Sequence, residues 1–312
     1  MAEEKRKGVV TRAHGNRFIV CCDGDNFNCQ VLKKVKFLSE KSNPVVVGDD
    51  VNLIVTGPDT GAIEFVYKRR RILSRPAVGQ EGVEQVLAAN IDSLIIVTST
   101  RKPALKPGLI DRFLIVAQMG GLKPAIVINK IDLQYDREIK ELATLYRGLG
   151  YDLFLTRALN ASGFEHGSKT APNDLKKLHR YLGRHRSILA GHSGAGKSSL
   201  LNKFYPGLNL KISDISKASG KGRHTTSHFE LFQLPGGGCV IDSPGLKVLG
   251  LWQMEKESLA GYFPEMSRLA GSCRFARCSH IHEPECAIKD AVEKGKISSW
   301  RYNSYVSIYN SL

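Results

Sequence analysis

The amino-acid sequence predicts a multidomain chain: an N-terminal β-barrel, a central α/β core and a mainly helical C-terminal domain that binds a metal. Three observations predict this architecture. Short strand-like segments follow one another closely in residues 1–72. Apolar strands alternate with amphipathic helices in residues 73–250, which is typical of an α/β domain with a mainly parallel sheet. A compact group of cysteine and histidine residues distinguishes residues 251–312.

The first segment predicts a small barrel. Its strand-like runs are residues 9–12, 17–20, 31–37, 45–55 and 62–67. The first two runs flank His14-Gly15-Asn16, which suits a hairpin turn. Closely spaced short strands in a segment of about 70 residues are typical of a five-stranded barrel of the oligonucleotide-binding (OB) type. The segment ends in the basic run Lys68-Arg69-Arg70-Arg71, which indicates either contact with phosphate or a solvated strand end.

The central segment predicts strands at residues 94–98, 125–128, 188–190 and 240–241, and helices at residues 111–119, 136–149 and 198–204. The strands are short apolar runs, as expected of parallel strands that are buried on both faces. One strand therefore leads directly into the glycine-rich residues that begin at position 191, and a helix follows them.

These glycine-rich residues have the sequence of a phosphate-binding P-loop, Gly191-His192-Ser193-Gly194-Ala195-Gly196-Lys197-Ser198. Glycines in such a loop let backbone N–H groups converge on phosphate oxygens, and the dipole of the following helix adds to the attraction. We expect Lys197 to reach the β- and γ-phosphates as a catalytic residue, and the Ser198 hydroxyl to ligate Mg²⁺. Ser199 completes the expected nucleotide contacts.

The tetrad Asn129-Lys130-Ile131-Asp132 predicts which base is bound. The Asp132 carboxylate can accept hydrogen bonds from both N1–H and the 2-amino group of guanine, a pair of donors that adenine lacks. Lys130 is expected to lie along the base, and Asn129 to tie the loop together. An ordinary turn after a buried strand is the alternative, but the P-loop favours a guanine site. In an ordinary GTPase the P-loop comes first; here the tetrad precedes it, which implies a circularly permuted GTPase core.

Residues 242–246 predict which groups surround the γ-phosphate. Asp242-Ser243-Pro244-Gly245 follows a strand, so we expect Asp242 to hold Mg²⁺ through water and the Gly245 N–H to sense the γ-phosphate. Leu246 stands where Ras-like enzymes keep the glutamine that orients the attacking water, and leucine cannot make that hydrogen bond. The hydrolytic group must therefore come from elsewhere in the chain or from a partner.

The basic, glycine-rich residues 219–226 predict a mobile switch whose threonine completes the Mg²⁺ shell in the GTP state. Thr225 is the preferred ligand and Thr226 the alternative. His224 beside them is a candidate catalytic residue that positions water, although an exposed histidine touching solvent or RNA phosphate fits nearly as well. The segment expected to support the ribose and base, Thr156-Arg157-Ala158-Leu159, matches the usual Ser-Ala-Lys only at its alanine.

Cys273, Cys278, His280 and Cys286 supply three thiolates and one imidazole within 14 positions. Four soft ligands without an acidic or open position fit one closed, tetrahedral, structural zinc site. An iron–sulfur cluster ordinarily needs four cysteines. The alternative is a set of buried reduced cysteines with a surface histidine, and His282 is a rival ligand two residues later.

The chain carries 45 Lys and Arg residues against 30 Asp and Glu residues, a net charge of +15. Such an excess indicates a polyanionic partner such as nucleic acid, because cations that neutralise phosphates release counterions. A general solubility charge is the alternative.

No apolar run is long enough for a membrane span, and the charged start predicts no signal peptide. Seven cysteines, an odd number, argue against a disulfide framework and predict a reducing, cytoplasmic location.

In their combination and order, these motifs resemble the bacterial RsgA (YjeQ) family of GTPases, which depend on the small ribosomal subunit. Ala88-Ala89-Asn90-Ile91-Asp92 and Arg301-Tyr302-Asn303-Ser304-Tyr305 extend the resemblance over nearly the whole chain. It implies an OB barrel, a permuted GTPase core and a zinc-binding helical domain. It also implies binding of GTP and GDP, contact with the small subunit and its rRNA, and GTP hydrolysis stimulated by the subunit during late maturation. We expect a monomer.

Two other functions fit less well. The guanine tetrad and the net charge argue against a P-loop kinase or ATPase acting on a metabolite. The intact Lys197, Ser198 and Asp242 argue against an RNA-binding scaffold with a vestigial nucleotide site. Because residue 245 leads directly toward the zinc domain and the barrel joins the core near its other end, loss of the γ-phosphate could move both outer domains.

Tyr302, Tyr305 and Tyr309 in the C-terminal tail have helical spacing. This spacing predicts a packed helix face in preference to a surface on which bases stack.

Overall fold

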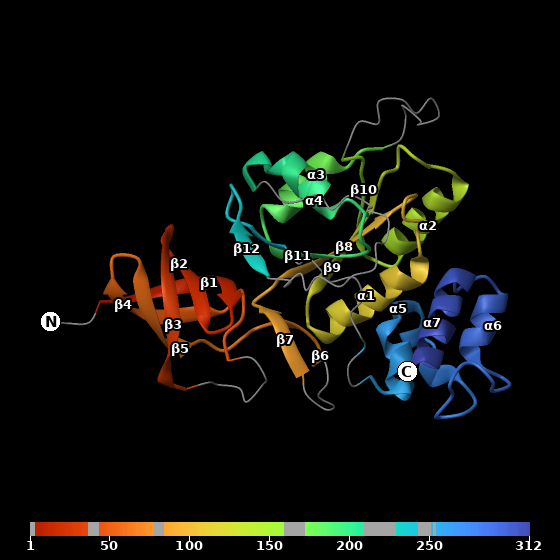
Figure 1. Cartoon of the computed structure of the whole chain (residues 1–312). Helices are drawn as coiled ribbons and strands as arrows, with labels where there is room; N and C mark the ends of the chain where they lie inside the picture. Colours follow the sequence, from red (N-terminus) through yellow and green to blue (C-terminus); the bar gives the residue numbers. More distant parts are fainter. Residues whose placement is uncertain are drawn as a thin grey trace, which may run out of the picture.

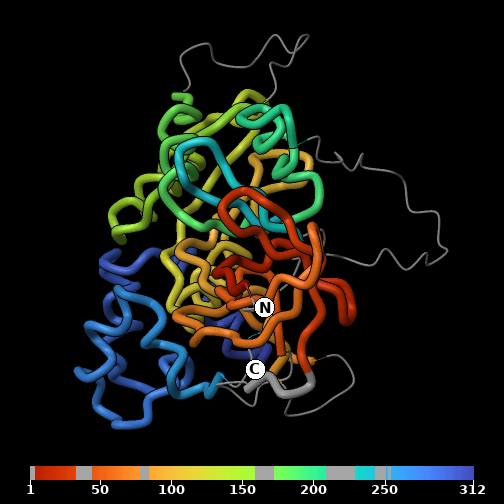
Figure 2. Tube along the Cα trace, turned by 90° about the vertical axis from the view of Figure 1, so that its left-hand side faces the viewer, coloured from red at the N-terminus to blue at the C-terminus, as the bar shows by residue number. Residues whose placement is uncertain are grey.

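The structure, a computed structural model, describes residues 4–36, 44–77, 84–158, 172–208, 229–242, 251 and 254–312. Figure 1 shows a barrel and a group of C-terminal helices at opposite ends of a central α/β core. In Figure 2, seen from the barrel side, the N-terminal strands lie in front of the core. The predicted order of a barrel, an α/β core and a mainly helical C-terminal region is confirmed.

The barrel consists of β1 (Lys5–His14), β2 (Arg17–Cys22), β3 (Asp25–Lys36), β4 (Asp50–Gly57) and β5 (Thr60–Val66). β1, β2 and β3 pair as an antiparallel meander, β3 pairs with β5 in parallel, and β4 pairs with both β5 and β1. This pairing closes the sheet, so the barrel has no free edge. Each strand contributes to its apolar core, for example Val10, Val20, Phe27, Leu53 and Ile63.

Two barrel strands differ in their bounds from the predicted ones. The strand predicted at residues 31–37 begins already at Asp25, because residues 25–29 pair with β2. The strand predicted at residues 45–55 begins only at Asp50. Just before it, Gly48 has a φ of +90°, and a Cβ atom there would lie 2.1 Å from the Ala89 carbonyl oxygen. Residues 48 and 49 still exchange backbone hydrogen bonds with Val10 of β1, and Gly48 brings this turn against the backbone of Ala89.

The core sheet contains parallel strands β8 (Ser93–Ser99), β9 (Lys123–Asn129), β10 (Asp152–Leu155), β11 (Arg186–Ala190) and β13 (Cys239–Asp242), with β12 (Glu230–Gln233) antiparallel to β13. Their order is β10-β9-β8-β11-β13-β12. β12 also pairs with β1 where Arg12 meets Glu230, so barrel and core form one continuous sheet. β6 (Ile72–Pro76) and β7 (Glu84–Ala89), between barrel and core in the chain, form a separate antiparallel pair.

Helices cover both faces of the core sheet (Figure 1). α1 (Pro107–Met119) and α2 (Arg137–Gly148) pack on one face, in an apolar cluster with Leu94 and Ile96 of β8. α3 (Leu175–Leu182) and α4 (Lys197–Phe204) pack on the other face with Ile95 and Val97, and a short 3₁₀ turn, η1 (Pro206–Leu208), follows α4. Alternate residues of one strand thus point to opposite layers, as pleating requires.

The C-terminal domain contains η2 (Lys256–Tyr262), α5 (Pro264–Ser267), η3 (Ala270–Ser272), α6 (Ala287–Glu293) and α7 (Ser299–Ser311). Its apolar cluster includes Ile115 of α1, so this domain packs directly on the core. Tyr305 is 1% exposed and belongs to the cluster, and Tyr302 and Tyr309 pack against it. The packed tyrosine face predicted from helical spacing is confirmed.

A buried charge network connects α7 with the core. The Arg301 guanidinium forms an ion pair with Asp111 of α1 and donates a hydrogen bond of 2.6 Å to Glu265 of α5. The Tyr146 hydroxyl of α2 donates to the same Asp111 carboxylate at 2.6 Å. Burial alone would lower the pKa of Arg301, but the neighbouring carboxylates, Asp111 before Glu265, raise it above its ordinary value. Arg301 therefore stays charged inside the joint.

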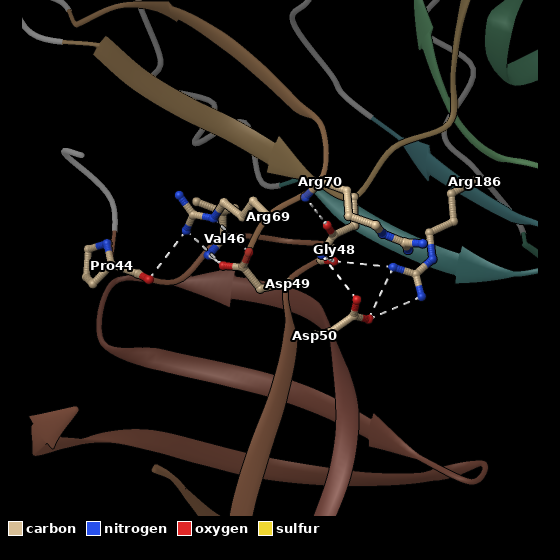
Figure 3. Close-up of polar contacts among 9 residues, drawn as sticks. Pro44, Val46, Gly48, Asp49, Asp50, Arg69, Arg70 and Arg186 are labelled. Atoms are coloured by element: carbon tan, nitrogen blue, oxygen red, sulfur yellow. Dashed lines mark hydrogen bonds and ion pairs between the residues drawn. The ribbon is translucent and has the colours of Figure 1, made fainter. Parts of the chain in front are cut away.

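A polar joint connects the barrel with the core (Figure 3). Arg186, the first residue of β11, approaches the Gly48 carbonyl oxygen and the Asp50 carboxylate at 3.4 Å each. Asn90, which precedes β8, donates a hydrogen bond of 3.0 Å to the same Gly48 oxygen. The strand that carries the P-loop thus touches the barrel at its opposite end.

The basic run at residues 68–71 belongs partly to this joint. Arg69 donates hydrogen bonds of 2.8 and 2.9 Å to the two carboxylate oxygens of Asp49, which is fully buried (Figure 3). Arg71 pairs with Asp92 at 2.9 Å. Arg69 is thus held inside the fold, whereas Arg71 is exposed in its ion pair, as expected of a solvated strand end.

Candidate nucleotide site and metal centre

Three segments singled out by the sequence meet at one edge of the core sheet. β9 ends at Asn129, β11 ends just before the P-loop, and β13 ends at Asp242. Because these strands are parallel, their carboxyl ends share one edge, which is where ligands bind in open α/β sheets. Only β8 separates β9 from β11. The tetrad and the P-loop therefore lie side by side although the chain visits them in reversed order.

The P-loop conformation depends on its glycines. Gly191 has a φ of +136°, and a Cβ atom there would lie 2.0 Å from the Val97 carbonyl oxygen. Gly196, which precedes the first residue of α4, has a φ of +97° and would place a Cβ atom 2.3 Å from Asn129 Nδ2. Only glycine fits either position without displacing a neighbour.

Polar groups of the loop are partly directed inward. The Lys197 ammonium donates to the carbonyl oxygens of Gly191 at 2.8 Å and of His192 at 3.1 Å, and so lies over the loop. Ser193 is exposed, whereas Ser198 is half-buried and Ser199 is 9% exposed at the start of α4. The Lys197 amine is therefore held where phosphate oxygens would approach a P-loop.

The tetrad is bonded directly to the P-loop. Asn129, which is 1% exposed, donates from Nδ2 to the Ala195 carbonyl oxygen at 3.0 Å. Lys130 has a φ of +59° and donates from Nζ to the Gly194 carbonyl oxygen at 2.7 Å. These two contacts join the two motifs across β8.

The end of the tetrad has a different environment. Ile131 is 1% exposed and anchors the loop, while Asp132 is half-buried. Among the described residues, no group donates a hydrogen bond to the Asp132 carboxylate. Its negative charge nevertheless acts on the nearby Lys130 ammonium. Burial lowers the pKa of Lys130, and Asp132 opposes that shift. Asp132 therefore has acceptor capacity for a ligand beside the loop.

Two threonines support the tetrad: Thr156, from the segment expected to support the ribose and base, and Thr100, which the sequence did not indicate. Thr156 is fully buried, and its hydroxyl donates to Asn129 Oδ1 at 3.1 Å, which orients the amide so that Nδ2 points to the P-loop. Thr100 is 4% exposed and donates to the Lys130 carbonyl oxygen at 2.6 Å. Each threonine directly follows a buried strand, Thr100 after β8 and Thr156 after β10, and this position was the signal in the sequence that could have indicated their role. Thr156 lies in the segment that matched the expected motif poorly.

Several expected site residues lie outside the described residues. These are His224, Thr225, Thr226, Gly245, Leu246 and Leu159. Asp242 is described and half-buried at the end of β13.

The four expected metal ligands form one cluster. The ligand atoms of Cys273, Cys278, His280 and Cys286 all lie within 4.8 Å of one another. His280 Nδ1 is 3.5 Å from the sulfur atoms of both Cys273 and Cys286, and these two sulfurs are 3.9 Å apart. His282, the rival ligand in the sequence, is exposed and lies outside the cluster.

The distances among Cys273, His280 and Cys286 fit a tetrahedral metal. With a metal–sulfur distance of about 2.3 Å and a metal–nitrogen distance of about 2.0–2.1 Å, tetrahedral zinc spaces its sulfurs about 3.8 Å apart and sulfur from nitrogen about 3.5 Å. The loop is also braced by α7. Tyr302 donates to the His280 carbonyl oxygen and Tyr305 to that of Ser279, each at 2.8 Å. The packed tyrosine face thus supports the metal loop.

Comparisons with known proteins agree over most of the chain. Residues 66–252 match the family model described as RsgA GTPase. A relative from Geobacillus sp. (strain WCH70), named small ribosomal subunit biogenesis GTPase RsgA, is 37% identical over 98% of this chain and 97% of its own. A relative of the same name from Chlorobaculum parvum is 37% identical over 99% of both chains.

Two solved structures are similar to this chain over nearly its whole length. The crystal structure of YjeQ from Thermotoga maritima is 33% identical, with a TM-score of 0.76 over 99% of both chains. The structure of YloQ, described as a circularly permuted GTPase, is 27% identical, with a TM-score of 0.70 over 99% of this chain and 95% of that one. In the described part of the chain, every helix is too short or too polar to cross a bilayer.

Proposed function

Because the chain belongs to the RsgA GTPase family and is a GTP hydrolase, we propose that its GTP hydrolysis serves the late maturation of the small ribosomal subunit and is stimulated by that subunit. The named relatives and the excess of basic residues support this partner. The observation that carries the proposal is the contact of Asn129 with Ala195, which joins a base-reading tetrad to a phosphate-binding loop.

In the proposed complex, Asp132 accepts hydrogen bonds from guanine, Lys130 lies along the base, and Asn129 holds the tetrad to the P-loop. The phosphates lie against the loop and Lys197 leaves its carbonyl partners to reach the β- and γ-oxygens. The full set of proposed GTP contacts is Asn129 to Asp132, Gly191 to Ser199, Asp242 and Gly245.

Ser198, Thr225 and Asp242 are the proposed holders of Mg²⁺, which when bound neutralises charge between the β- and γ-phosphates. Leu246 cannot orient water, so we assign that role to His224. On this proposal, intrinsic hydrolysis is slow without the subunit, and contact with RNA makes His224 effective.

The cysteine–histidine cluster is proposed to hold one structural zinc ion. Three thiolates and one imidazole are ligands that zinc accepts, and no described oxygen ligand enters the cluster. Binding would join η3, the metal loop and α6, because Cys273 follows η3 and Cys286 immediately precedes α6. The metal would then contribute to folding and not to hydrolysis.

The proposed domains are a barrel (1–72), a permuted GTPase core (73–250) and a zinc-binding helical domain (251–312). We propose that a monomer acts in the cytoplasm, beside ribosomal subunits, with barrel and zinc domain as two RNA-contacting arms. The switch residues adjoin β12 and β13 in the chain, and β12 pairs with the barrel, so nucleotide state can bias the barrel's position.

Turnover of GTP and ATP, measured with and without purified small subunits, tests the proposal. We expect slow GTP hydrolysis alone, marked stimulation by subunits and little use of ATP. Preference for ATP would favour a kinase or ATPase, and subunit binding without turnover would favour an RNA-binding scaffold.

Two variants test the assigned residues. Asp132→Asn should shift preference from guanine toward xanthine nucleotides, because an amide presents a donor where guanine needs an acceptor.

His224→Ala should keep GTP binding and lose most subunit-stimulated turnover. Single-turnover rates at saturating subunit that match those of the unchanged protein would remove His224 from the mechanism.

A further inference from the structure

One surface of the core carries positive charge without matching acidic residues. It is formed by α3 and α4, on the face of the sheet opposite to α1 and α2. The described segment 172–208, which contains both helices, has seven Lys or Arg residues and one acidic residue, Asp174. Its exposed cations, which define the α3/α4 basic surface, are Lys176, Lys177, Arg180, Arg184 and Lys203.

These cations are mostly unpaired. Lys177 forms an ion pair of 2.9 Å with Asp174, which is only 7% exposed and also accepts a hydrogen bond from Arg147 at 3.4 Å. Asp174 therefore adds little negative charge to the surface. The other four cations of the set have no carboxylate partner among the residues that the structure describes.

Barrel strand β1 shows a different pattern. Its cations Lys5, Arg6 and Arg12 pair with Glu64, Glu4 and Glu230, respectively, and Lys7 lies over the Tyr67 ring. Paired charges cancel at a distance, whereas unpaired charges of one sign add to a field that attracts a polyanion. The α3/α4 basic surface is therefore a stronger candidate for electrostatic docking than this barrel strand.

The surface is held rigidly. Leu178 and Leu182 of α3 are each 1% exposed and anchor the helix on the sheet. The His179 ring lies 5.2 Å from the rings of both Phe204 and Tyr205, so α3 packs against the end of α4 next to Lys203. Lys176 and Arg180 are four residues apart and thus share one helix face.

We propose that the α3/α4 basic surface binds the phosphate backbone of double-stranded RNA. The identity of that RNA, a helix of the small ribosomal subunit, rests on the proposed function. Lys and Arg side chains suit phosphate contacts that do not depend on sequence. Single strands are usually held by exposed aromatic side chains, but the aromatic residues of this segment, Tyr181, Phe204 and Tyr205, are half-buried or buried. Duplex RNA, recognised by shape and backbone, fits better.

Bound RNA would touch the layer that supports the nucleotide site. α4 begins at Lys197 of the P-loop and ends beside Lys203. The surface therefore gives the core its own contact with RNA, separate from the barrel and from the C-terminal domain.

The test compares two charge-neutralising double variants in the full chain. Lys176→Gln/Arg180→Gln removes two cations of α3, and Arg137→Gln/Lys140→Gln removes two exposed cations of α2 as a matched control. Binding to purified small subunits and to a plain RNA duplex is measured over a range of salt concentrations. Melting temperature and GTP hydrolysis without RNA check that both variants remain folded.

The α3 variant should bind both probes about tenfold or more weakly, and the slope of log K against log salt should fall by about two. The α2 variant should stay within about twofold of the unchanged protein, since its charges are balanced by acidic neighbours. This result supports the surface.

Three other outcomes would overturn RNA binding by this surface, and a fourth would refute only the proposed function. Equal losses in both variants would mean that only net charge matters. A loss for subunits but not for duplex RNA would mean that this surface meets a ribosomal protein. If neither probe bound more weakly, the α3/α4 basic surface would not be an RNA-binding site, and the proposed function would be unaffected. Conversely, α3-dependent binding of the duplex by a protein that ignores subunits would retain the surface and refute the proposed function.

Discussion

The ion pairs that link the core with the barrel and with the C-terminal domain differ in solvation. At the C-terminal joint, Arg301 and Asp111 have side chains that are 2% and 1% exposed. At the barrel joint, Arg186 and Asp50 are 22% and 23% exposed and lie 3.4 Å apart. The difference matters because breaking a buried ion pair is costly, whereas a solvated pair contributes little.

Apolar packing crosses both joints. Ile115 of α1 belongs to the apolar cluster of the C-terminal domain. The barrel has its own cluster, but Val9 and Ala13 of β1 also pack against the cluster of the core. We infer that the two joints differ chiefly in their ion pairs, and that the buried pair makes the C-terminal joint the stronger one.

Removing a proposed metal ligand should have the largest effect on the stability of the C-terminal domain. Cys278→Ser should lose the metal and unfold the C-terminal domain, because a structural site contributes about 10–16 kcal/mol of binding free energy to folding. Elemental analysis and limited proteolysis measure the two consequences. Cys239→Ser, at a half-buried thiol in β13 outside the cluster, is the control. One full metal equivalent in purified Cys278→Ser would contradict the ligand set.

Breaking the buried ion pair should have the next largest effect. Arg301→Met should lower the free energy of unfolding by about 3–5 kcal/mol, because Asp111 is left buried without its cation. Denaturant titration measures this loss. Adding Asp111→Asn should recover part of it by removing the stranded charge.

The neighbouring arginine provides a control in the same joint. Arg112 of α1 donates a hydrogen bond of 2.7 Å to the Ser311 hydroxyl of α7 and is less buried than Arg301. Arg112→Met should cost about 1 kcal/mol. Equal losses for Arg112→Met and Arg301→Met would contradict a special role for the buried charge.

The smallest effect is expected at the barrel joint. Arg186→Met should change the free energy of unfolding by about 0–1 kcal/mol, since the pair is partly solvated. Hydrogen exchange should instead show faster opening around residues 44–50. A loss as large as that of Arg301→Met would mean that both joints are rigid and would remove the distinction between the two arms.

The sequence predicted features that depend on neighbours along the chain. Glycine spacing in the P-loop, the tetrad after an apolar strand and the short interval from Cys273 to Cys286 are all local patterns. Each specifies its own backbone, so the three segments could be recognised before their relative positions were known. The parallel sheet then brings the P-loop and the tetrad together, as expected of strands that share one carboxyl edge.

Contacts between distant segments were not predictable in this way. Arg186 meets Asp50 from 136 positions away, and Arg301 meets Asp111 from 190 positions away. Nothing near Arg69 in the sequence indicates that Asp49 will bury its guanidinium against the barrel. The bond of Thr156 to Asn129 was not predictable either, because the Asn129 amide comes from another strand.

The position of β11 has a consequence for synthesis of the chain. In the finished sheet β8 lies between β9 and β11, yet the ribosome releases β8 and β9 well before β11. Until residue 190 has emerged, one edge of the apolar β8 has no strand to pair with, and such edges favour misassembly. A nascent chain of this protein is also unable to bind GTP until its P-loop emerges, long after the base-reading tetrad. The permuted order thus makes nucleotide binding a late event in synthesis of the chain. Nascent chains stalled before residue 190 should be the ones that need a chaperone.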